Sequence, residues 1–101
     1  MAFTRLPLDS VVWAAGGNPL ERKKTAAAGA TVIEFAPGFA DPNWCERAHV
    51  AYVLSGTLRL EVAGRIEEVA AGDGFVTDRG TPHRASNPGA DPVRLFVITA
   101  E

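Results

Sequence analysis

The sequence contains few of the side chains that bind metals or carry out covalent chemistry. Its 101 residues include one cysteine, two histidines, one methionine and one tyrosine. A single cysteine excludes an internal disulfide bond, so we expect the protein to work in a reducing compartment. Imidazole and thiolate are nevertheless the groups that bind transition metals best, and the places of these three residues in the chain therefore matter.

Long apolar runs and an excess of charge of either sign are also missing. No apolar run approaches the roughly 20 residues that span a bilayer. Residues 1–7 lack the charged and then apolar segments of a signal peptide. The net charge of −2 gives no reason to expect nucleic acid or a membrane surface as a partner. We therefore expect a soluble, cytoplasmic protein.

Short apolar segments separated by turn residues predict an all-β fold. In one of them Leu58, Leu60 and Val62 alternate with Arg59 and Glu61, which is typical of a strand with one face in water. Strands are also predicted at residues 10–13, 31–35, 50–54, 66–69, 75–77 and 93–99. Strands spaced about 8–12 residues apart predict an antiparallel sandwich or barrel. With 47% hydrophobic residues, residues 1–101 should form one domain.

Residues 20–28 give conflicting signals. Asn18, followed by Pro19 and Glu21, is typical of the start of a helix, and Gly29 would suit its end. The four charged residues at positions 21–24, however, leave no apolar stripe at helical spacing. Local chemistry alone slightly favours a helix.

The cysteine and both histidines lie in two short stretches. Cys45 and His49 fall within residues 43–56, and His83 falls within residues 72–87. This confinement suggests one site for a transition metal. The alternatives from these residues alone are two histidines satisfied by hydrogen bonds without metal, a buried and unreactive Cys45, and a Cys45 nucleophile with His49 as base. No oxyanion hole or third orienting group for such a nucleophile is recognisable.

The second stretch resembles one of the two sequence motifs of the cupin superfamily, which are small jelly-roll barrels. That motif is a Gly, five residues, Pro-x-Gly, two residues, a His, three residues and an Asn. This chain has Gly72, Asp78, Gly80, His83 and Asn87 at these positions, so only the proline is replaced.

The first stretch resembles the other cupin motif, in which a Gly is followed by His-x-His, a Glu, six residues and a closing Gly. Here Gly38 opens the motif and Gly56 closes it. Together the two motifs extend the resemblance over about residues 30–99, and two spaced motifs are a specific signal. The resemblance implies an all-β, cupin-like double-stranded β-helix, or jelly-roll, barrel. It also implies that residues 20–28 are strand and loop rather than helix.

The resemblance implies a metal site with altered ligands. When Gly56 is aligned, Asn43 and Cys45 replace the two motif histidines, His49 replaces the glutamate, and His83 is retained. The implied set is therefore Asn43, Cys45, His49 and His83, with Asn43 the weakest ligand and suited also to holding water or the loop. Zinc or iron would suit this set best, with manganese, nickel or copper as further candidates.

One geometric condition must be met for these side chains to share an ion. In an extended strand Cys45 and His49 would be about 13 Å apart, at ~3.3 Å per residue. Metal–ligand bonds of roughly 2.0–2.3 Å cannot bridge that distance. The chain must therefore bend across residues 46–48, and His83 must arrive from a neighbouring strand.

The implied function is a metal-dependent enzyme that acts on a small molecule, of dioxygenase, isomerase or lyase type. Three protein ligands would leave one position for water or substrate. A non-catalytic cupin module that binds or senses a small molecule is the alternative, and a scaffold with a filled barrel is a third. We also expect a homodimer, because cupins of this size commonly pair and apolar edge segments such as residues 93–99 or 10–13 need protection.

Overall fold

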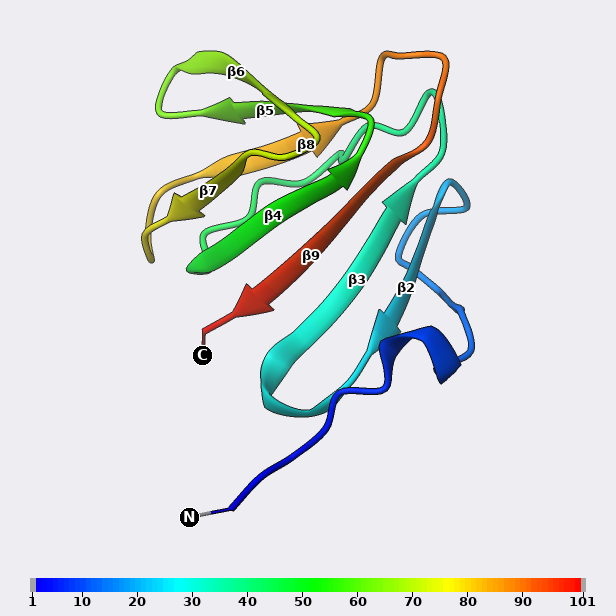
Figure 1. Ribbon diagram of the computed structural model, residues 1–101. Coiled ribbons are helices and arrows are strands. Elements are labelled where there is room, and N and C mark those ends of the chain that lie inside the picture. Colours follow the sequence, from blue (N-terminus) through cyan, green and yellow to red (C-terminus); the bar gives the residue numbers. More distant parts are fainter. Residues whose placement is uncertain (1, 101) are drawn as a thin grey trace.

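The computed structural model describes residues 2–100 and consists of two antiparallel β-sheets (Figure 1). The strands are β1 (Ala14–Ala15), β2 (Glu21–Thr25), β3 (Ala30–Phe35), β4 (His49–Ser55), β5 (Thr57–Val62), β6 (Arg65–Ala70), β7 (Gly74–Thr77), β8 (His83–Ser86) and β9 (Val93–Thr99). Two short 3-10 helices, η1 (Leu8–Ser10) and η2 (Ala27–Gly29), complete the elements of this part of the chain. None of its helices has the length and apolar character needed to cross a membrane.

The order of the strands in space differs from their order in the chain. The larger sheet has the order β1-β2-β3-β9-β4-β7, and the smaller one has the order β6-β5-β8. The last strand, β9, lies between β3 and β4, with Val93 opposite Phe35 and Leu95 opposite Val53 (Figure 1). The predicted all-β, antiparallel fold is confirmed.

The central place of β9 corrects one expectation. Residues 93–99 were predicted to be an exposed edge that a second chain would protect. Both sides of β9 are instead hydrogen-bonded to strands of the same chain, so this segment offers no free edge.

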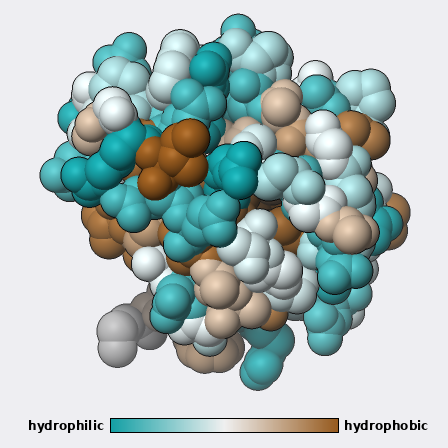
Figure 2. Space-filling view, turned by 90° about the horizontal axis from the view of Figure 1, so that it is seen from above, coloured by the Kyte–Doolittle hydropathy of each residue, from teal (hydrophilic) through white to brown (hydrophobic). Residues whose placement is uncertain are grey.

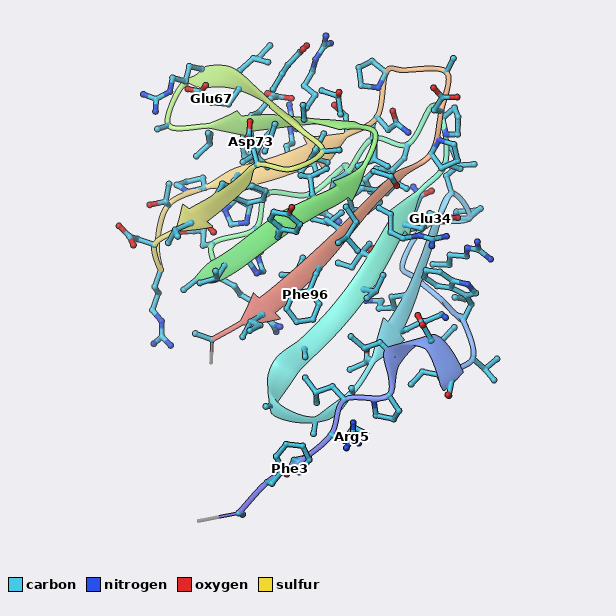
Figure 3. The ribbon with its side chains drawn as sticks, in the orientation of Figure 1. Phe3, Arg5, Glu34, Glu67, Asp73 and Phe96 are labelled. Carbon is cyan, nitrogen blue, oxygen red and sulfur yellow. The ribbon has the colours of Figure 1, made fainter. Side chains whose placement is uncertain are left out.

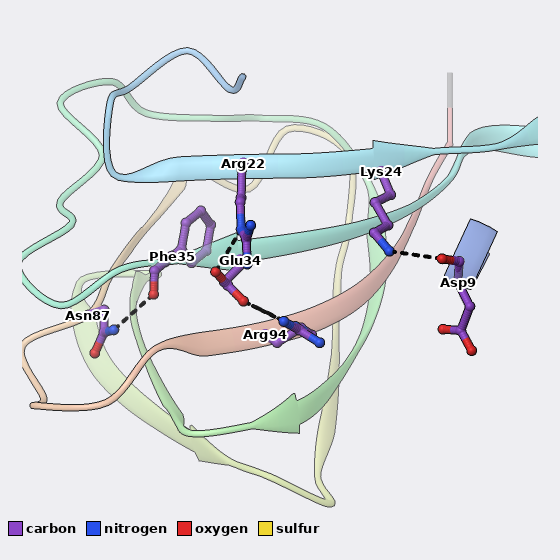
Figure 4. A network of polar contacts seen from close by, with 7 residues as sticks. All are labelled: Asp9, Arg22, Lys24, Glu34, Phe35, Asn87 and Arg94. Atoms are coloured by element: carbon purple, nitrogen blue, oxygen red, sulfur yellow. Dashed lines mark hydrogen bonds and ion pairs between the residues drawn. The ribbon is translucent and has the colours of Figure 1, made fainter. Parts of the chain in front are cut away.

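The structure also resolves the conflicting signals of residues 20–28. They form β2 followed by η2, as the cupin resemblance implied, and not a helix. The charged side chains of β2 fit a strand because one face of β2 is exposed to solvent. There Glu34 of β3 accepts hydrogen bonds from Arg22, at 2.8 Å, and from Arg94 of β9, at 2.6 Å (Figure 4). Cross-strand ion pairing thus outweighs the local helix signal.

One predicted strand is absent, and one observed strand was not predicted. Residues 10–13 are not a strand: Ser10 is the last residue of η1, residues 11–13 belong to no strand, and β1 begins only at Ala14. Trp13 instead lies against cations, with the guanidinium of Arg22 4.2 Å and the Nζ of Lys24 4.8 Å from the ring centre. The polar strand β8 was not predicted, because its residues carry no alternating apolar pattern.

The hydrophobic core is shared by the two sheets. Val53 of β4 and Leu58 of β5 are almost fully buried, and Phe35 stacks on Phe39 with ring centres 4.1 Å apart. Burial of each such side chain stabilises the fold by roughly 1.5–3 kcal/mol. Motif residue Asn87 is also buried, and its amide donates to the carbonyl of Phe35 (Figure 4) and to that of Asp91. Asn87 therefore ties the last turn to β3.

The outer face of the larger sheet is unusually apolar. Alternate residues of β4 point outward, and Val50, Tyr52 and Leu54 are each about half exposed. Tyr52 lies directly opposite Phe96 of β9 (Figure 3). Val76 of β7 and Ile98 of β9, opposite Val50, extend the same patch. By contrast, the end of the molecule that carries β6 is mostly hydrophilic, with isolated apolar residues (Figure 2).

Candidate metal centre

Backbone pairing places Cys45 beside His83. Residues 38–45 run antiparallel to the free edge of β8, and Asp41 N–H donates to the Ala85 carbonyl at 2.9 Å. Cys45 and His83 exchange both backbone hydrogen bonds, at 2.8 and 2.9 Å. Directly opposed residues of this kind have Cα atoms about 5.5 Å apart, so their side chains start from neighbouring positions.

The bend that the sequence required is present between Cys45 and His49. The carbonyl of Glu46 accepts from Gly80 N–H at 2.8 Å, and the carbonyl of Arg47 accepts from the Thr77 hydroxyl at 3.4 Å. These two bonds turn the chain, and β4 then begins at His49. The Sγ of Cys45 consequently lies 3.5 Å from the Nε2 of His49. One ligand atom from each of Cys45, His49 and His83 lies within 4.8 Å of the others.

The ring of His83 presents a lone pair to the site. Its Nδ1 is 2.9 Å from the Thr81 carbonyl, which can only accept, so Nδ1 carries the proton and Nε2 is free to accept. His83 is buried, and its Nε2 has no hydrogen-bond partner among residues 2–100. An unsatisfied buried acceptor costs about 1–3 kcal/mol. A metal ion would remove that cost, and a ligating histidine usually donates its other N–H to a carbonyl in this way.

The ring of His49 is held by the two strands that flank it. Its register partners are Thr77 of β7 and Thr99 of β9. The Thr77 hydroxyl accepts from the backbone N–H of His49 at 3.2 Å, and the Thr99 Oγ1 lies 3.0 Å from the ring atom Nδ1 of His49. Burial, together with repulsion from His83 and Arg47, holds the pKa of His49 below its usual 6.5. His49 is therefore neutral at pH 7, the form that binds metals.

Asn43 as the remaining ligand stays a prediction. Asn43 is exposed, and its backbone N–H donates to Asp41 Oδ1 at 3.0 Å. Asp41 lines the cavity described below, whereas Asn43 does not. Cys45 is a half-buried free thiol, so the structure brings together three of the four predicted residues.

The cluster opens onto a small cavity between the sheets. Its volume is about 150 Å³. Most of the lining is apolar and comes from both sheets, including Phe35, Ala51, Leu58, Leu60, Phe75 and Leu95. Three polar residues, Glu21, Asp41 and Arg84, also line it. The three candidate ligands thus face a space in which a small molecule could bind.

Sequence reasoning missed the residues that orient the two rings. The Thr81 carbonyl fixes the tautomer of His83, and the hydroxyls of Thr77 and Thr99 contact His49. No sequence signal identifies them, because a backbone carbonyl is present at every residue and threonine is common in strands. Only the register of β4 with β7 and β9 reveals their role.

Solved structures support the fold assignment. The predicted oxalate decarboxylase of Thermotoga maritima superposes with a TM-score of 0.82, at 14% identity, over 95% of this chain and 97% of that chain. A cupin domain of an XRE-family transcriptional regulator from Enterobacter cloacae gives 0.62, at 21% identity, over 71% and 79%. The polyketide cyclase RemF of Streptomyces resistomycificus gives 0.76, at 27% identity, over 99% and 81%.

Comparison of the sequence with protein families agrees with these structures. The cupin domain profile matches residues 31–99, a segment that contains both motifs and all three clustered residues. None of the curated proteins is similar enough in sequence to count as a relative. Since the matched segment covers more than half of the chain, the protein belongs to the cupin family.

Proposed function

We propose that the protein is a metal-dependent enzyme that acts on a small molecule. Cys45, His49 and His83 would hold one transition-metal ion at the cavity that they line. The observation that carries this proposal is the buried, unpartnered Nε2 of His83, which lies with Cys45 Sγ and an imidazole nitrogen of His49 in one cluster. Three solved structures of the same fold, an oxalate decarboxylase, a polyketide cyclase and a sugar phosphate isomerase, are named as enzymes and add support.

Each residue has a distinct part in this proposal. His83 is fixed as the Nε2 donor by the Thr81 carbonyl, and His49 is oriented by Thr99. Cys45 would bind as the thiolate, which neutralises part of the charge of a divalent ion. The bound ion would supply Lewis-acid or redox chemistry. The apolar lining excludes water from the substrate and strengthens electrostatic interactions at the cluster.

The donor set favours a borderline or soft ion. One thiolate with two imidazoles suits zinc or iron, and also nickel or copper, better than manganese, which prefers oxygen ligands. Asn43 as a fourth ligand remains a prediction, and its exposed position gives it no support. With three protein ligands, a coordination position is left for substrate, as in catalytic zinc sites.

A non-catalytic binding or sensing module is the second candidate function. The structural likeness to the cupin domain of a transcriptional regulator favours it. Such a module would keep the cavity and the ion but would not turn over a substrate. A pure scaffold is not supported, because a barrel filled by side chains would leave no cavity of about 150 Å³.

Elemental analysis of protein purified without chelator tests the metal site. We expect about one zinc or iron ion per chain in the parent and a loss of most of it in His83→Ala. Asn43→Ala is the matched control and should keep its metal. A parent that stays metal-free after reconstitution with zinc and with iron would contradict the proposal, as would equal metal in parent and His83→Ala.

We also propose that the chain is one cytoplasmic domain that forms a homodimer. The edge-strand argument for the dimer no longer applies, but the apolar outer face of the larger sheet gives a better one. Five large apolar side chains at roughly half exposure form a patch of the kind that marks interfaces. A standard interface buries about 800 Å² on each partner, and a second copy of the same flat face would cover this patch.

A further inference from the structure

The size of the cavity limits what can bind beside the three candidate ligands. Pockets for drug-sized molecules typically have volumes of about 300–1,000 Å³. This cavity has about 150 Å³, and an apolar cavity of about that volume accommodates one benzene ring. A disaccharide, a nucleotide or a polycyclic molecule could place only one ring in this space.

The apolar lining of the cavity also favours apolar ligands over polar ones. Ile33, Phe35 and Leu95 line it from the larger sheet, and Leu58 and Leu60 line it from the smaller one. A polar group placed against these side chains would lose its hydrogen bonds to water without replacement. Hydroxyl-rich ligands such as sugars are therefore disfavoured over apolar rings.

The charges around the cavity disfavour anions. Arg84 is the one cationic side chain among the described residues that line it. Its guanidinium donates to both carboxylate oxygens of Glu61, at 3.0 and 3.3 Å, and lies over the ring of Trp44 at 4.2 Å. The other two charged lining residues, Glu21 and Asp41, are acidic. A carboxylate or phosphate would thus find no uncommitted cation among these side chains.

We propose that the natural ligand is a neutral, largely apolar molecule of about the size of one six-membered ring, with a single nitrogen, oxygen or sulfur atom that faces Cys45, His49 and His83. The role of that atom rests on the metal-dependent function proposed above. The preference for size, neutrality and apolar character belongs to the cavity itself and holds in the metal-free protein. Small dicarboxylates, sugar acids and sugar phosphates are disfavoured by the lining of the cavity.

Methyl-resolved NMR of the metal-free and zinc-loaded protein tests this inference. The probes are benzene, phenol, benzoate and oxalate, so that benzoate matches the ring and differs in charge. We expect benzene and phenol to shift the methyl signals of Leu58 and Leu95 in both forms, and benzoate and oxalate to leave them unchanged in the metal-free form. Phenol should bind at least tenfold more tightly to the zinc form than to the metal-free form, and more tightly than benzoate does.

Substitutions of two neighbouring residues test whether the probes bind in the cavity. Ala51 lines the cavity, whereas the adjacent Val50 points to the outer face and is 57% exposed. Ala51→Leu should fill the cavity and weaken phenol binding at least tenfold while zinc still binds, and Val50→Leu should change neither. If Ala51→Leu does not fold, Ala85→Leu fills the same cavity from the smaller sheet.

The outcomes separate this inference from the proposed function. Failure of zinc to bind would overturn the metal-dependent function, and benzene binding to the metal-free form would still support the apolar selectivity. Zinc binding without any methyl shift from benzene or phenol would overturn the inference alone. Tighter binding of oxalate or benzoate than of phenol would overturn it as well.

Discussion

At the scale of single residues, the two histidines differ in how their rings are held. His83 is fixed by a backbone carbonyl, which no substitution of Thr81 removes, whereas His49 depends on the side-chain hydroxyl of Thr99. A partner of this kind fixes the orientation of a ligand, and its loss typically lowers metal affinity about 10–100-fold. Thr99 therefore allows a test that leaves all three candidate ligands in place.

We expect Thr99→Val to lower zinc affinity about tenfold or more, because the hydroxyl that holds His49 Nδ1 is lost while the shape is kept. Competition with a chromophoric chelator measures the affinity. Thr57→Val is the control, since Thr57 is exposed at the start of β5. Equal affinity of Thr99→Val and the parent would show that the hydroxyl does not orient a ligand.

The ion pairs of Glu34 predict how the stability of the fold depends on pH. The hydrogen bond from Arg22, with that from Arg94, holds the pKa of Glu34 below its usual 4.5. The ion pair therefore stabilises the fold fully above pH 4.5, and this contribution is lost as the pH falls through the lower, folded-state pKa. Glu34→Gln should be less stable than the parent at pH 7, and the difference should shrink only below pH 4.5. Urea unfolding at several pH values checks this, and a difference independent of pH would contradict it.

At the scale of elements, the closing glycine of the first motif shows that part of the sequence pattern serves the fold. Gly56 joins β4 to β5 with φ of +76°, and an added Cβ would lie 2.6 Å from the Pro92 carbonyl oxygen. Both the positive φ and the close backbone approach require glycine there. This position of the motif is thus a requirement of the fold and not of the metal site.

Gly56→Ala should destabilise the protein by at least ~1–2 kcal/mol, the cost of a left-handed residue with a side chain, with the clash in addition. Gly17→Ala is the matched control, because its added Cβ would have no atom within 4 Å. Thermal unfolding should show a lower midpoint for Gly56→Ala only. A midpoint unchanged from the parent would mean that the turn is not as close as described.

The elements also show how far sequence reasoning reaches. The strand at residues 58–62 was predicted from its apolar alternation, which records one buried face, and residues 31–35 were predicted from their β-branched and aromatic side chains. The polar strands β2 and β8 lack this pattern, and their place depends on pairing with β3 and β5. Likewise, the sequence identified three clustered side chains, but not that threonines flank His49. Long-range register decides these points, and no local pattern records it.

At the scale of the whole molecule, the proposed dimer rests on the outer face of the larger sheet. Val50 lies near the centre of the apolar patch, between Val76 and Ile98 on neighbouring strands. Val50→Lys should convert the proposed dimer into a monomer, because a charge would be buried without a partner. Light scattering at micromolar concentration measures this, with Ile66→Lys as a control for an exposed apolar residue of the smaller sheet. A monomeric parent would reject the dimer.

The central claim is that Cys45, His49 and His83 hold a metal ion, and the absorption spectrum of the cobalt-substituted protein tests it most directly. A cobalt–thiolate bond gives a charge-transfer band that imidazole and carboxylate ligands do not give. We predict this band in the parent and in Asn43→Ala, its loss in Cys45→Ser with some cobalt still bound, and weak cobalt binding in His83→Ala. Cobalt bound to the parent without the band would exclude Cys45 as a ligand and contradict the claim.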